Sequence, residues 1–471
     1  MRGLDPRIHI LLPVCEKVVD GRDKPGHDEV ESVMGADFLT IPQSLTRFRL
    51  ANARVPLCLL AGATQLTADA DGFAGADIVI EKKSIASIAP PAAVNDGLPR
   101  FDLEGGIVLP RLVDVHTHID KGQIWARAQN PDGTHMGARM AVMADRDKNW
   151  SRDDVARRMD FALRCAFAHG TGALRTHIDS YPKQTPVSWP LFAEMREQWK
   201  GRIALQAVSL CPIDVVNDEA VFRDLVATVA KHGGILGGLT FLGEAPSPKT
   251  DAMLDKIFQA ANANGLDLDF HVDESDSPKA RSLGQIAEAA LRHRFKGRIV
   301  AGHCCSLALA GDEERAAIIA KVAQTGIAVV SLPMCNMYLQ DRVPERTPRW
   351  RGVAPLHELA AAGVTVMVAS DNTRDPFYAY GDLDMLEVFR EATRILHFDH
   401  SQLPWLKTIA ATPGAVMRLP HGRMAVGAPE GLVLTRARTM NELLSRPQHD
   451  RVVLCAGKPV DRTLPDYREL D

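Results

Sequence analysis

The sequence lacks any apolar stretch long enough to cross a membrane. A spanning helix needs about 18 or more apolar residues, and the longest such run near the start, Val55 to Ala63, is only about half that length. The chain also lacks an excess of one charge, since 55 Lys and Arg residues face 59 Asp and Glu residues, for a formal net charge of -4. No basic stretch interleaved with aromatic residues is present. Neither a membrane nor a nucleic acid is therefore expected as a partner.

The chain has few cysteines and no regular cysteine spacing. Eight are present, Cys304 and Cys305 are adjacent, and no C-x-x-C pair occurs. This pattern disfavours both a disulfide framework and a cysteine zinc site. With 46% apolar and 24% charged residues the composition is ordinary for a soluble enzyme, and a cytoplasmic location fits best.

The first 44 residues show neither helical nor strand periodicity. The segment 20–28 mixes Gly, Pro, Asp, Arg and Lys, and charged residues interrupt every apolar run, which disfavours a secretory signal. We expect residues 1–44 to form a disordered lead. Residues 1–33 also resemble a translated intergenic repeat found at misassigned starts in some bacterial genomes, which makes Met34 an alternative start.

Short alternating apolar runs lie near both ends of the chain. They include residues 76–81 and 84–89 on one side, and residues 431–434 and 451–458 on the other, and Gly, Pro or Asp residues separate them. Alternation with a period of two is typical of strands with one buried face. We therefore expect residues 45–105 and 415–471 to form one small composite β-sandwich domain.

Between the two ends, apolar strand patterns alternate with helical patterns. Ser151 and Asp154 form a capping box before a helix whose apolar face carries Val155, Met159 and Leu163. Eight strand and helix units over residues 106–414 predict an α/β fold, a (β/α)8 barrel of the TIM type, with its chemistry at the carboxyl ends of the strands. The candidate strands are 107–116, 172–177, 203–210, 235–242, 266–272, 298–303, 327–332 and 364–370.

Metal-type side chains recur at the ends of these strands. His116 and His118 follow the first strand two positions apart, so that they face the same side. The others are His177 after the second strand, His271 and Glu274 after the fifth, His303 after the sixth, and Asp371 with Asn372 after the eighth. Because the carboxyl ends of the strands meet at the same edge of a barrel, we expect these residues to share one site.

Three neutral imidazoles and one carboxylate suit a single divalent zinc or iron ion. His116, His118 and His271 supply the nitrogens and Asp371 the oxygen, and a position remains for water. A second metal would need a bridging lysine or acid on the fourth strand, and the run 237–242 offers none. The sequence therefore predicts one ion.

For the other residues at strand ends the sequence suggests roles outside the four-ligand set, and for two of them it leaves alternatives open. Glu274 follows His271 by three positions and is expected to act as an acid and base toward water. His303 is either a fourth ligand or a hydrogen-bond donor, and we favour the donor. His177 either contacts the ligand or packs at the rim. We expect five histidines to be surface or packing residues, namely His135, His293, His397, His400 and His421.

At this point the motifs resemble those of the amidohydrolase superfamily, in particular the cytosine deaminase group, which includes isopropylammelide amidohydrolases. The resemblance runs from about Pro56 to Val460. It is carried by residues 106–110 before the H-x-H, by R-T-H-I-D at 175–179, by H-V-D-E at 271–274, by N-M-Y-L-Q-D-R at 336–342, by P-R-W-R-G at 348–352 and by S-D-N-T-R-D-P-F at 370–377. It implies the same metal ligands, proton transfer by Glu274 and a polarising role for His303.

Three positions depart from the cytosine deaminase pattern. The segment 208–214 lacks the glutamine that pairs with the pyrimidine edge, Asn372 stands in place of an aspartate, and Phe377 in place of a tryptophan. Asn372 can donate as well as accept, and Phe377 leaves a roomier pocket. Both are expected to bind substrate.

The resemblance implies a metal-dependent hydrolytic deaminase of a small nitrogen heterocycle, cytosine deaminase-like, in which water displaces ammonia. The alternative is an amidohydrolase of a cyclic amide or an N-alkyl aminotriazine. The expected partner is thus a small heterocyclic substrate. Members of the group are often homo-oligomers, and no segment of this sequence predicts a number of subunits.

Overall fold

The computed structural model describes residues 38–471 except 63–64, 93–95, 241–245, 402–403 and 429–430. Most of the expected lead over residues 1–44 therefore lies outside the described residues. In the part of the chain that is described, no helix is long and apolar enough to cross a membrane. The seven cysteines found there are all free, as the irregular cysteine spacing predicts.

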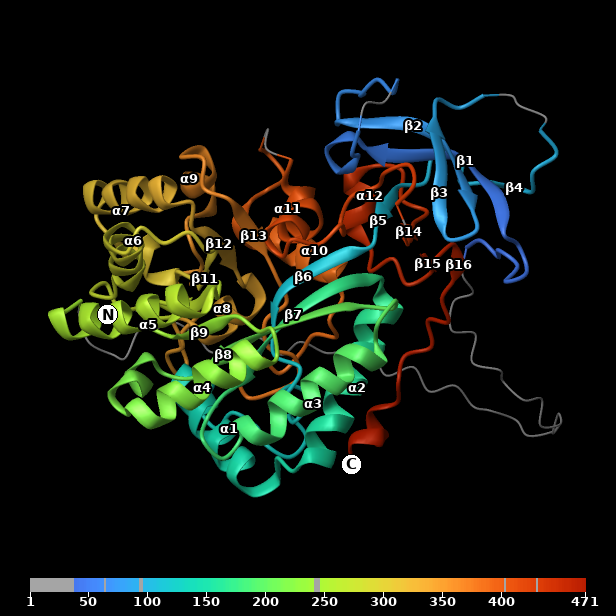
Figure 1. Cartoon of the computed structure of the whole chain (residues 1–471). Coiled ribbons are helices and arrows are strands. Elements are labelled where there is room, and N and C mark those ends of the chain that lie inside the picture. The colour runs from blue at the N-terminus through green and yellow to red at the C-terminus, as the bar shows by residue number, and fades with distance from the viewer. Residues whose placement is uncertain (1–37, 63–64, 93–95, 241–245, 402–403, 429–430) are drawn as a thin grey trace, which may run out of the picture. The chain divides into compact units, whose positions relative to one another are not determined.

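The chain forms a mixed α/β fold (Figure 1). Its strands are β1 (Arg47–Pro56), β2 (Phe73–Glu81), β3 (Ser84–Ala89), β4 (Arg100–Asp102), β5 (Val108–Pro110), β6 (Leu112–Thr117), β7 (Thr171–Asp179), β8 (Ala204–Leu210), β9 (Leu236–Leu239), β10 (Leu268–Val272), β11 (Ile299–His303), β12 (Ala328–Ser331), β13 (Val366–Val368), β14 (Leu432–Leu434), β15 (Val452–Cys455) and β16 (Lys458–Pro459).

Most of the helices alternate with the middle strands along the chain. They are α1 (His135–Asn149), α2 (Arg152–His169), α3 (Thr185–Gln198), α4 (Glu219–Lys231), α5 (Pro248–Asn264), α6 (Ser282–Arg292), α7 (Asp312–Thr325), α8 (Pro333–Leu339), α9 (Leu356–Ala361), α10 (Met385–Leu396), α11 (Ala411–Val416) and α12 (Met440–Ser445). Short 3₁₀ turns lie at Leu57–Leu59, Ile213–Asn217, Cys305–Leu309, Trp405–Ile409 and Tyr467–Leu470.

The middle strands form two parallel sheets. One has the order β6-β7-β8 and the other the order β13-β12-β11-β10-β9. Backbone hydrogen bonds join the two sheets at both pairs of edge strands. Between β8 and the start of β9, Ile235 N donates to Ala207 O over 2.9 Å, and between β6 and the end of β13, Asp371 N donates to His116 O over 2.9 Å. The eight strands expected between residues 107 and 370 are thus all present, with shifted ends.

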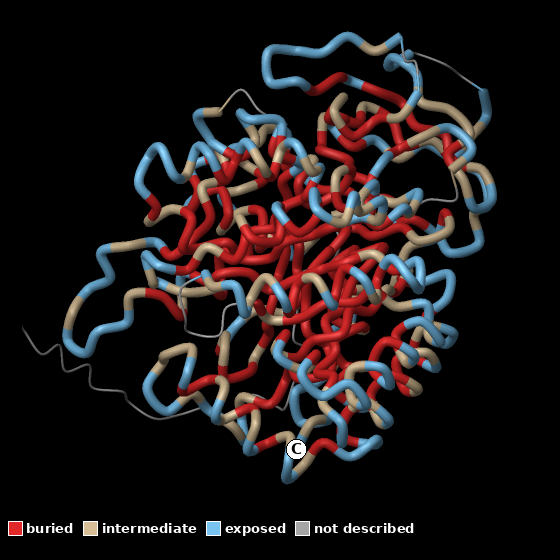
Figure 2. The backbone as a smooth tube through the Cα atoms, turned by 60° about the vertical axis from the view of Figure 1, so that its left-hand side comes forward, coloured by how far each residue is buried: buried red, intermediate tan, exposed pale blue. Residues whose placement is uncertain are grey.

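The strands bury both faces, as near-continuous apolar runs in parallel sheets predict. One face forms a core made largely of strand residues, which include Val113 and Val115 of β6, Val330 of β12 and Met367 of β13. This core draws on both sheets. The opposite face packs against the helices, and buried backbone accordingly fills the centre of the molecule in Figure 2.

The first expected strand is wrong in one respect, because it is two strands. β5 pairs antiparallel with β14 near the C-terminus, whereas β6 pairs parallel with β7. The break falls at Arg111, whose guanidinium donates to the carbonyl of Arg202 over 2.7 Å. The pairing of β5 with β14, more than 300 positions away along the chain, therefore decides where this run divides.

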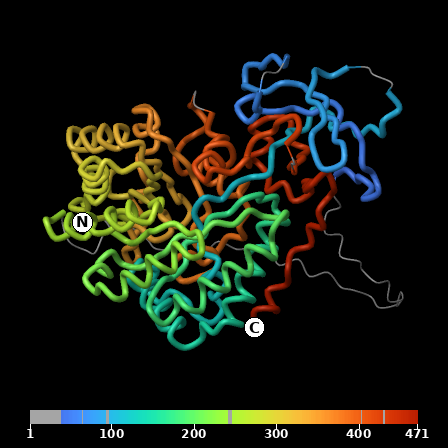
Figure 3. Tube along the Cα trace, in the orientation of Figure 1, coloured from blue at the N-terminus to red at the C-terminus, as the bar shows by residue number. Residues whose placement is uncertain are grey.

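Both ends of the chain contribute to two further sheets, of order β3-β2-β1-β4 and β16-β15-β14-β5. A common core joins them and includes Phe48, Ile78, Val108, Leu432 and Leu454, all almost fully buried. Figure 3 shows the blue N-terminal strands beside the red C-terminal segment. The two β-rich ends thus pack on each other.

The predicted cap of α2 is present in part. The Ser151 hydroxyl accepts from Asp154 N over 3.3 Å, and Val155, Met159 and Leu163 are buried. The Asp154 carboxylate does not complete the capping box. It pairs with Arg127 at 2.6 Å and with Arg158 at 2.9 Å instead, and so ties α2 to the loop after β6.

Candidate metal centre and cavity

Four of the predicted ligands converge on one point. The Nε2 atom of His271 lies 3.3 Å from Nε2 of His116 and 3.3 Å from Nε2 of His118. Oδ1 of Asp371 lies 3.6 Å from His116 Nε2 and 3.2 Å from His118 Nε2. His116 at the end of β6, His118 just after it, His271 in β10 and Asp371 after β13 thus meet at the carboxyl ends of these strands.

These separations fit a metal ion. A tetrahedral ion with bonds of about 2.0–2.1 Å holds its ligand atoms about 3.3–3.4 Å apart. Both carboxylate oxygens of Asp371 are buried and accept no hydrogen bond from the described residues. An unpaired buried carboxylate is costly unless a cation compensates it, so this residue set can hold a divalent ion.

The protonation states of the three histidines are those of metal ligands. Burial lowers the pKa values of His116, His118 and His271 well below those of exposed histidines, which leaves the rings neutral at pH 7. Burial raises the pKa of Asp371 well above its ordinary value, and the neighbouring Glu274 carboxylate adds to this. A bound cation acts in the opposite direction and favours the carboxylate.

His116 reaches the centre because its neighbour has no side chain. A Cβ atom at Gly302 of β11 would lie 2.8 Å from Cε1 of His116, closer than such atoms approach in proteins. Glycine at this position therefore makes room for the imidazole.

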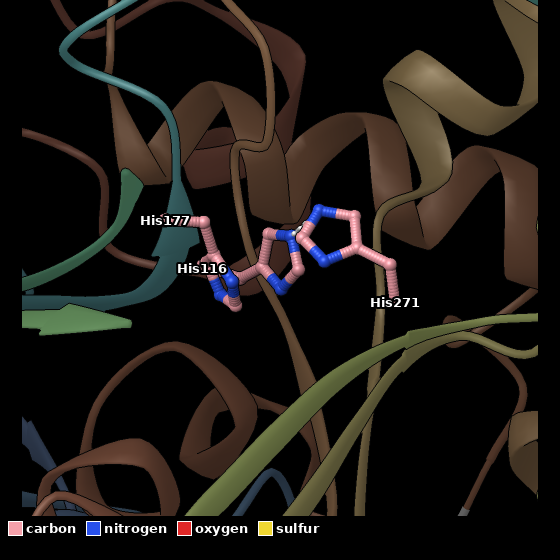
Figure 4. A group of neighbouring side chains, drawn as sticks. All are labelled: His116, His177 and His271. Carbon is pink, nitrogen blue, oxygen red and sulfur yellow. Dashed lines mark hydrogen bonds between the residues drawn. The ribbon is translucent and has the colours of Figure 1, made fainter. Parts of the chain in front are cut away.

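His177 lies beside the centre rather than in the cavity. Its ring stacks on that of His116 with centroids 3.8 Å apart, and Figure 4 shows the rings of His116, His177 and His271 gathered together. His177 is fully buried and is not among the residues that line the cavity. His177 has a ring nitrogen within 4.8 Å of ligand nitrogens of His116 and His271, and both predicted roles of this residue, a ligand contact and packing at the rim, stay predictions.

A cavity of about 600 Å³, counting the part open to solvent, lies over the centre. Six predicted site residues line it, whereas His116 and Asp371 lie beneath. Its remaining walls combine apolar and charged groups. The full lining is His118, Lys121, His135, Arg139, Val142, Met143, Arg146, Asp179, Tyr181, Leu210, Cys211, Pro212, Leu239, His271, Glu274, His303, Asn372 and Phe377.

Glu274 stands at the cavity wall with polar partners on both carboxylate oxygens. Oε1 accepts from Nδ2 of Asn336 over 3.2 Å and lies 3.5 Å from Nδ1 of His303, and Oε2 lies 3.4 Å from Nε2 of His135. Burial by itself raises the pKa of Glu274, but His303 and His135 outweigh it and keep the pKa below its ordinary value. The side chain is thus an ionised carboxylate next to the metal centre.

Asn372 and Phe377 also line the cavity. Nδ2 of Asn372 donates to Asp375 over 2.6 Å, so the carboxylate fixes the orientation of the amide. The ring of Phe377 meets that of His135 edge to face at 5.3 Å, and the Lys121 ammonium lies 5.2 Å from its centroid. Both residues are placed to contact a molecule in the cavity.

The surface or packing role expected for His135 is wrong. This residue begins α1, lines the cavity and approaches Glu274. Asn336, which had a place in a motif but no role, lies between Glu274 and His303. Neither residue directly follows a predicted strand: Asn336 lies one helical turn beyond the strand predicted at 327–332, and the sequence signal for His135 is only the cap at Thr134, which accepts from Gly137 N over 3.0 Å.

Comparison with known proteins assigns the sequence to a protein family. Residues 205–461 match the amidohydrolase family. A pterin deaminase of Rhizobium rhizogenes is 53% identical over 439 residues, which cover 93% of this chain and 99% of that protein.

Two solved structures share the fold. A 5-methylcytosine deaminase of Klebsiella pneumoniae bound to 5-fluorocytosine superposes with a TM-score of 0.75 at 22% identity, over 89% of this chain and 98% of the other. An N-isopropylammelide isopropylaminohydrolase of Burkholderia multivorans gives a TM-score of 0.70 at 26% identity, over 88% and 98%.

Proposed function

Because the chain belongs to the amidohydrolase family, we propose that it is a metal-dependent hydrolytic deaminase of a pterin-type heterocycle. The observation that carries this proposal is the meeting of three neutral imidazoles and one unpaired carboxylate beneath a cavity that an ionised glutamate lines. The 53% identity to a pterin deaminase supports the substrate class. A pterin and cytosine both carry an exocyclic amine on a ring carbon next to a ring nitrogen, so one chemistry serves both.

In this proposal His116, His118, His271 and Asp371 hold one divalent ion, zinc or iron. Such an ion supplies a Lewis acid that lowers the pKa of water toward about 7. The chain's own groups do the rest. Glu274 would take one proton from the attacking water and deliver it to the ring nitrogen beside the reacting carbon. It would then take the second proton from the new hydroxyl group on that carbon and pass it to the amine, which leaves as ammonia while the C=O bond forms. His303 donates a hydrogen bond to the reacting oxygen, and Asn372 and Phe377 bind the ring.

We also propose that the middle strands close into a (β/α)8 barrel over residues 106–414. The hydrogen bonds between the two parallel sheets at both edges, and the strand core that draws on both, support this. Residues 45–105 and 415–471 would then form the composite β-sandwich domain, which β5 joins as a strand from the barrel segment. The absence of disulfides among the described cysteines fits a cytoplasmic enzyme.

A second candidate is hydrolysis of an N-alkyl aminotriazine, favoured by the 26% identity to an N-isopropylammelide isopropylaminohydrolase. The same groups would act, and the leaving amine would carry an alkyl group. The two candidates differ in the product that is released.

The test is a product assay of the purified, zinc- or iron-loaded protein. Pterin, cytosine and N-isopropylammelide are supplied in turn, and ammonia and isopropylamine are measured. We expect ammonia from pterin in equal amount to the deaminated ring, with less from cytosine. Isopropylamine without ammonia would favour the second candidate, and no amine from any substrate would overturn both.

A further inference from the structure

Asn336 has no part in the chemistry described so far, yet its side chain connects the two groups that act on the substrate. It lies in α8 and is fully buried. Its Nδ2 atom is 2.9 Å from Nδ1 of His303 and 3.2 Å from Oε1 of Glu274. One amide nitrogen, with two hydrogens, thus serves two neighbours.

The carboxylate determines which way the amide faces. An ionised carboxylate only accepts hydrogen bonds, and Oε1 of Glu274 stands against the amide. If the amide were turned over, Oδ1 of Asn336 would face that oxygen and two acceptors would meet. Nδ2 therefore faces Glu274, and its second hydrogen points to the imidazole of His303.

This orientation determines the tautomer of His303. A nitrogen that accepts a hydrogen bond carries no proton, so Nδ1 of the neutral ring is unprotonated and the proton lies on Nε2. Among the described residues Nε2 of His303 is buried and has no partner, and His303 lines the cavity. The ring thus holds an N–H group free for a molecule in the cavity.

We propose that Asn336 is a positioning residue that fixes His303 in its Nε2–H tautomer and holds Glu274 in line with the same point of the cavity. A protonated nitrogen has no lone pair for a metal, so this tautomer gives His303 the role of a donor and not of a fourth ligand. The consequence for turnover rests on the deaminase function proposed above, whereas the tautomer itself does not.

The direct test is nitrogen NMR of the zinc-loaded protein labelled with ¹⁵N-histidine, in which the signals of His303 are assigned by their loss in His303→Gln. We expect an unprotonated Nδ1 and a protonated Nε2 in the unmodified protein. In Asn336→Asp the new carboxylate only accepts, and the proton should move to Nδ1. A protonated Nδ1 in the unmodified protein, or a tautomer unchanged in the variant, would overturn the proposal.

Two further variants keep the test decisive if Asn336→Asp does not fold. Asn336→Ala removes the amide and should give a mixture of tautomers in place of one, and retention of a single Nε2–H form there would count against the proposal. Met337→Ala is the matched control, because Met337 lies on the same helix, is 43% exposed and does not line the cavity. It should leave the His303 signals unchanged.

Kinetics then separate positioning from general damage. With a substrate that the unmodified protein deaminates, kcat of Asn336→Asp should fall about 100-fold, as for loss of one preorganised donor, with a smaller change in KM and the full metal content. Equal kcat values would overturn the proposal. If the unmodified protein releases no amine from any heterocycle, the proposed function fails, and the NMR result still decides the tautomer.

Discussion

The Nε2 atoms of His116 and His271 lie 3.3 Å apart, although 155 positions separate the two residues in the chain. Neither nitrogen is charged at neutral pH, because burial lowers both pKa values. Two lone pairs that face one another at this distance are unfavourable unless a proton or a cation lies between them. One ring N–H could join this pair alone, but His118 Nε2 also lies 3.3 Å from His271 Nε2 and 3.2 Å from Oδ1 of Asp371, and four groups at these distances fit a shared cation.

Substitution of one ligand should remove the ion. In His271→Ala, one of four ligand atoms is lost, and we expect the metal content measured by mass spectrometry after dialysis to fall from about one ion per chain to below about 0.2. His400→Gln is the matched control, since its side chain is 96% exposed. Equal metal content in both variants would mean that the ion binds elsewhere.

A single methyl group at Gly302 should have a similar but smaller effect. The added Cβ of Gly302→Ala meets Cε1 of His116 at 2.8 Å, and the imidazole must move away from the centre. We expect metal affinity, measured by competition with a chelator, to fall about 10–100-fold, as for loss of an orienting contact. Gly284→Ala is the control, because its Cβ would meet Ile318 at an ordinary 3.6 Å and should leave the affinity unchanged.

Loss of the acid and base should separate chemistry from metal binding. In Glu274→Gln the amide cannot take a proton from water, so kcat should fall about 10²–10⁴-fold while the metal content stays complete. The exposed residue Glu313 offers a control in Glu313→Gln. Turnover in Glu274→Gln close to that of the unmodified protein would remove this residue from the mechanism.

The size of the residue at position 377 should affect substrate choice. Phe377 stands where cytosine deaminases tend to carry tryptophan, and its ring forms part of the cavity wall next to His135. In Phe377→Trp we expect KM for pterin to rise about 10-fold, because the larger ring occupies space that a bicyclic substrate needs, with a smaller rise for cytosine. Parallel changes for both substrates would show that position 377 does not discriminate between them.

Stability should depend on a buried ion pair distant from the cavity. Arg451 contacts both carboxylate oxygens of Asp384, at 2.8 and 2.6 Å. Arg451→Met removes the arginine partner and leaves the buried carboxylate, among the described residues, with only the Leu386 N–H at 3.0 Å and His169 at 3.8 Å, so the free energy of unfolding in denaturant should fall by about 3–5 kcal/mol. Arg438→Met, at an exposed pair with Glu442, should cost less than about 1 kcal/mol.

The same pair sets a dependence on pH. Burial alone raises the pKa of Asp384, but Arg451 and His169 outweigh it and hold the pKa below its ordinary value. A carboxylate with a lowered pKa in the folded state stabilises the fold above about pH 4, and this contribution is lost as the pH falls further. The difference in unfolding free energy between the unmodified protein and Arg451→Met should therefore shrink below about pH 4. A constant difference would contradict the account.

Much of the fold could be predicted because its pattern is local. Each middle strand is a short apolar run, and a run such as 298–303 can be recognised as a strand without knowing which strand pairs with it. The residues that converge at the candidate metal centre could be predicted for the same reason, because they follow these runs directly. The division of the first run at Arg111 could not, since it depends on pairing with β14 far along the chain.

The parts of the site that the sequence did not predict come from helices and loops. His135 begins a helix whose apolar residues form no single face, since Ala138 and Val142 are buried while Met136 and Met140 are more than half exposed. Asn336 gains its role only from the position of Glu274 and His303 in space. Spacing along the chain carries no information about such contacts.

The most direct test of the account is anomalous X-ray diffraction at the zinc absorption edge from crystals of the zinc-loaded protein. We expect one strong peak, at about 2.0–2.2 Å from Nε2 of His116, His118 and His271 and from Oδ1 of Asp371. A peak at another position, or no peak in crystals whose protein contains zinc in solution, would contradict the proposed metal centre.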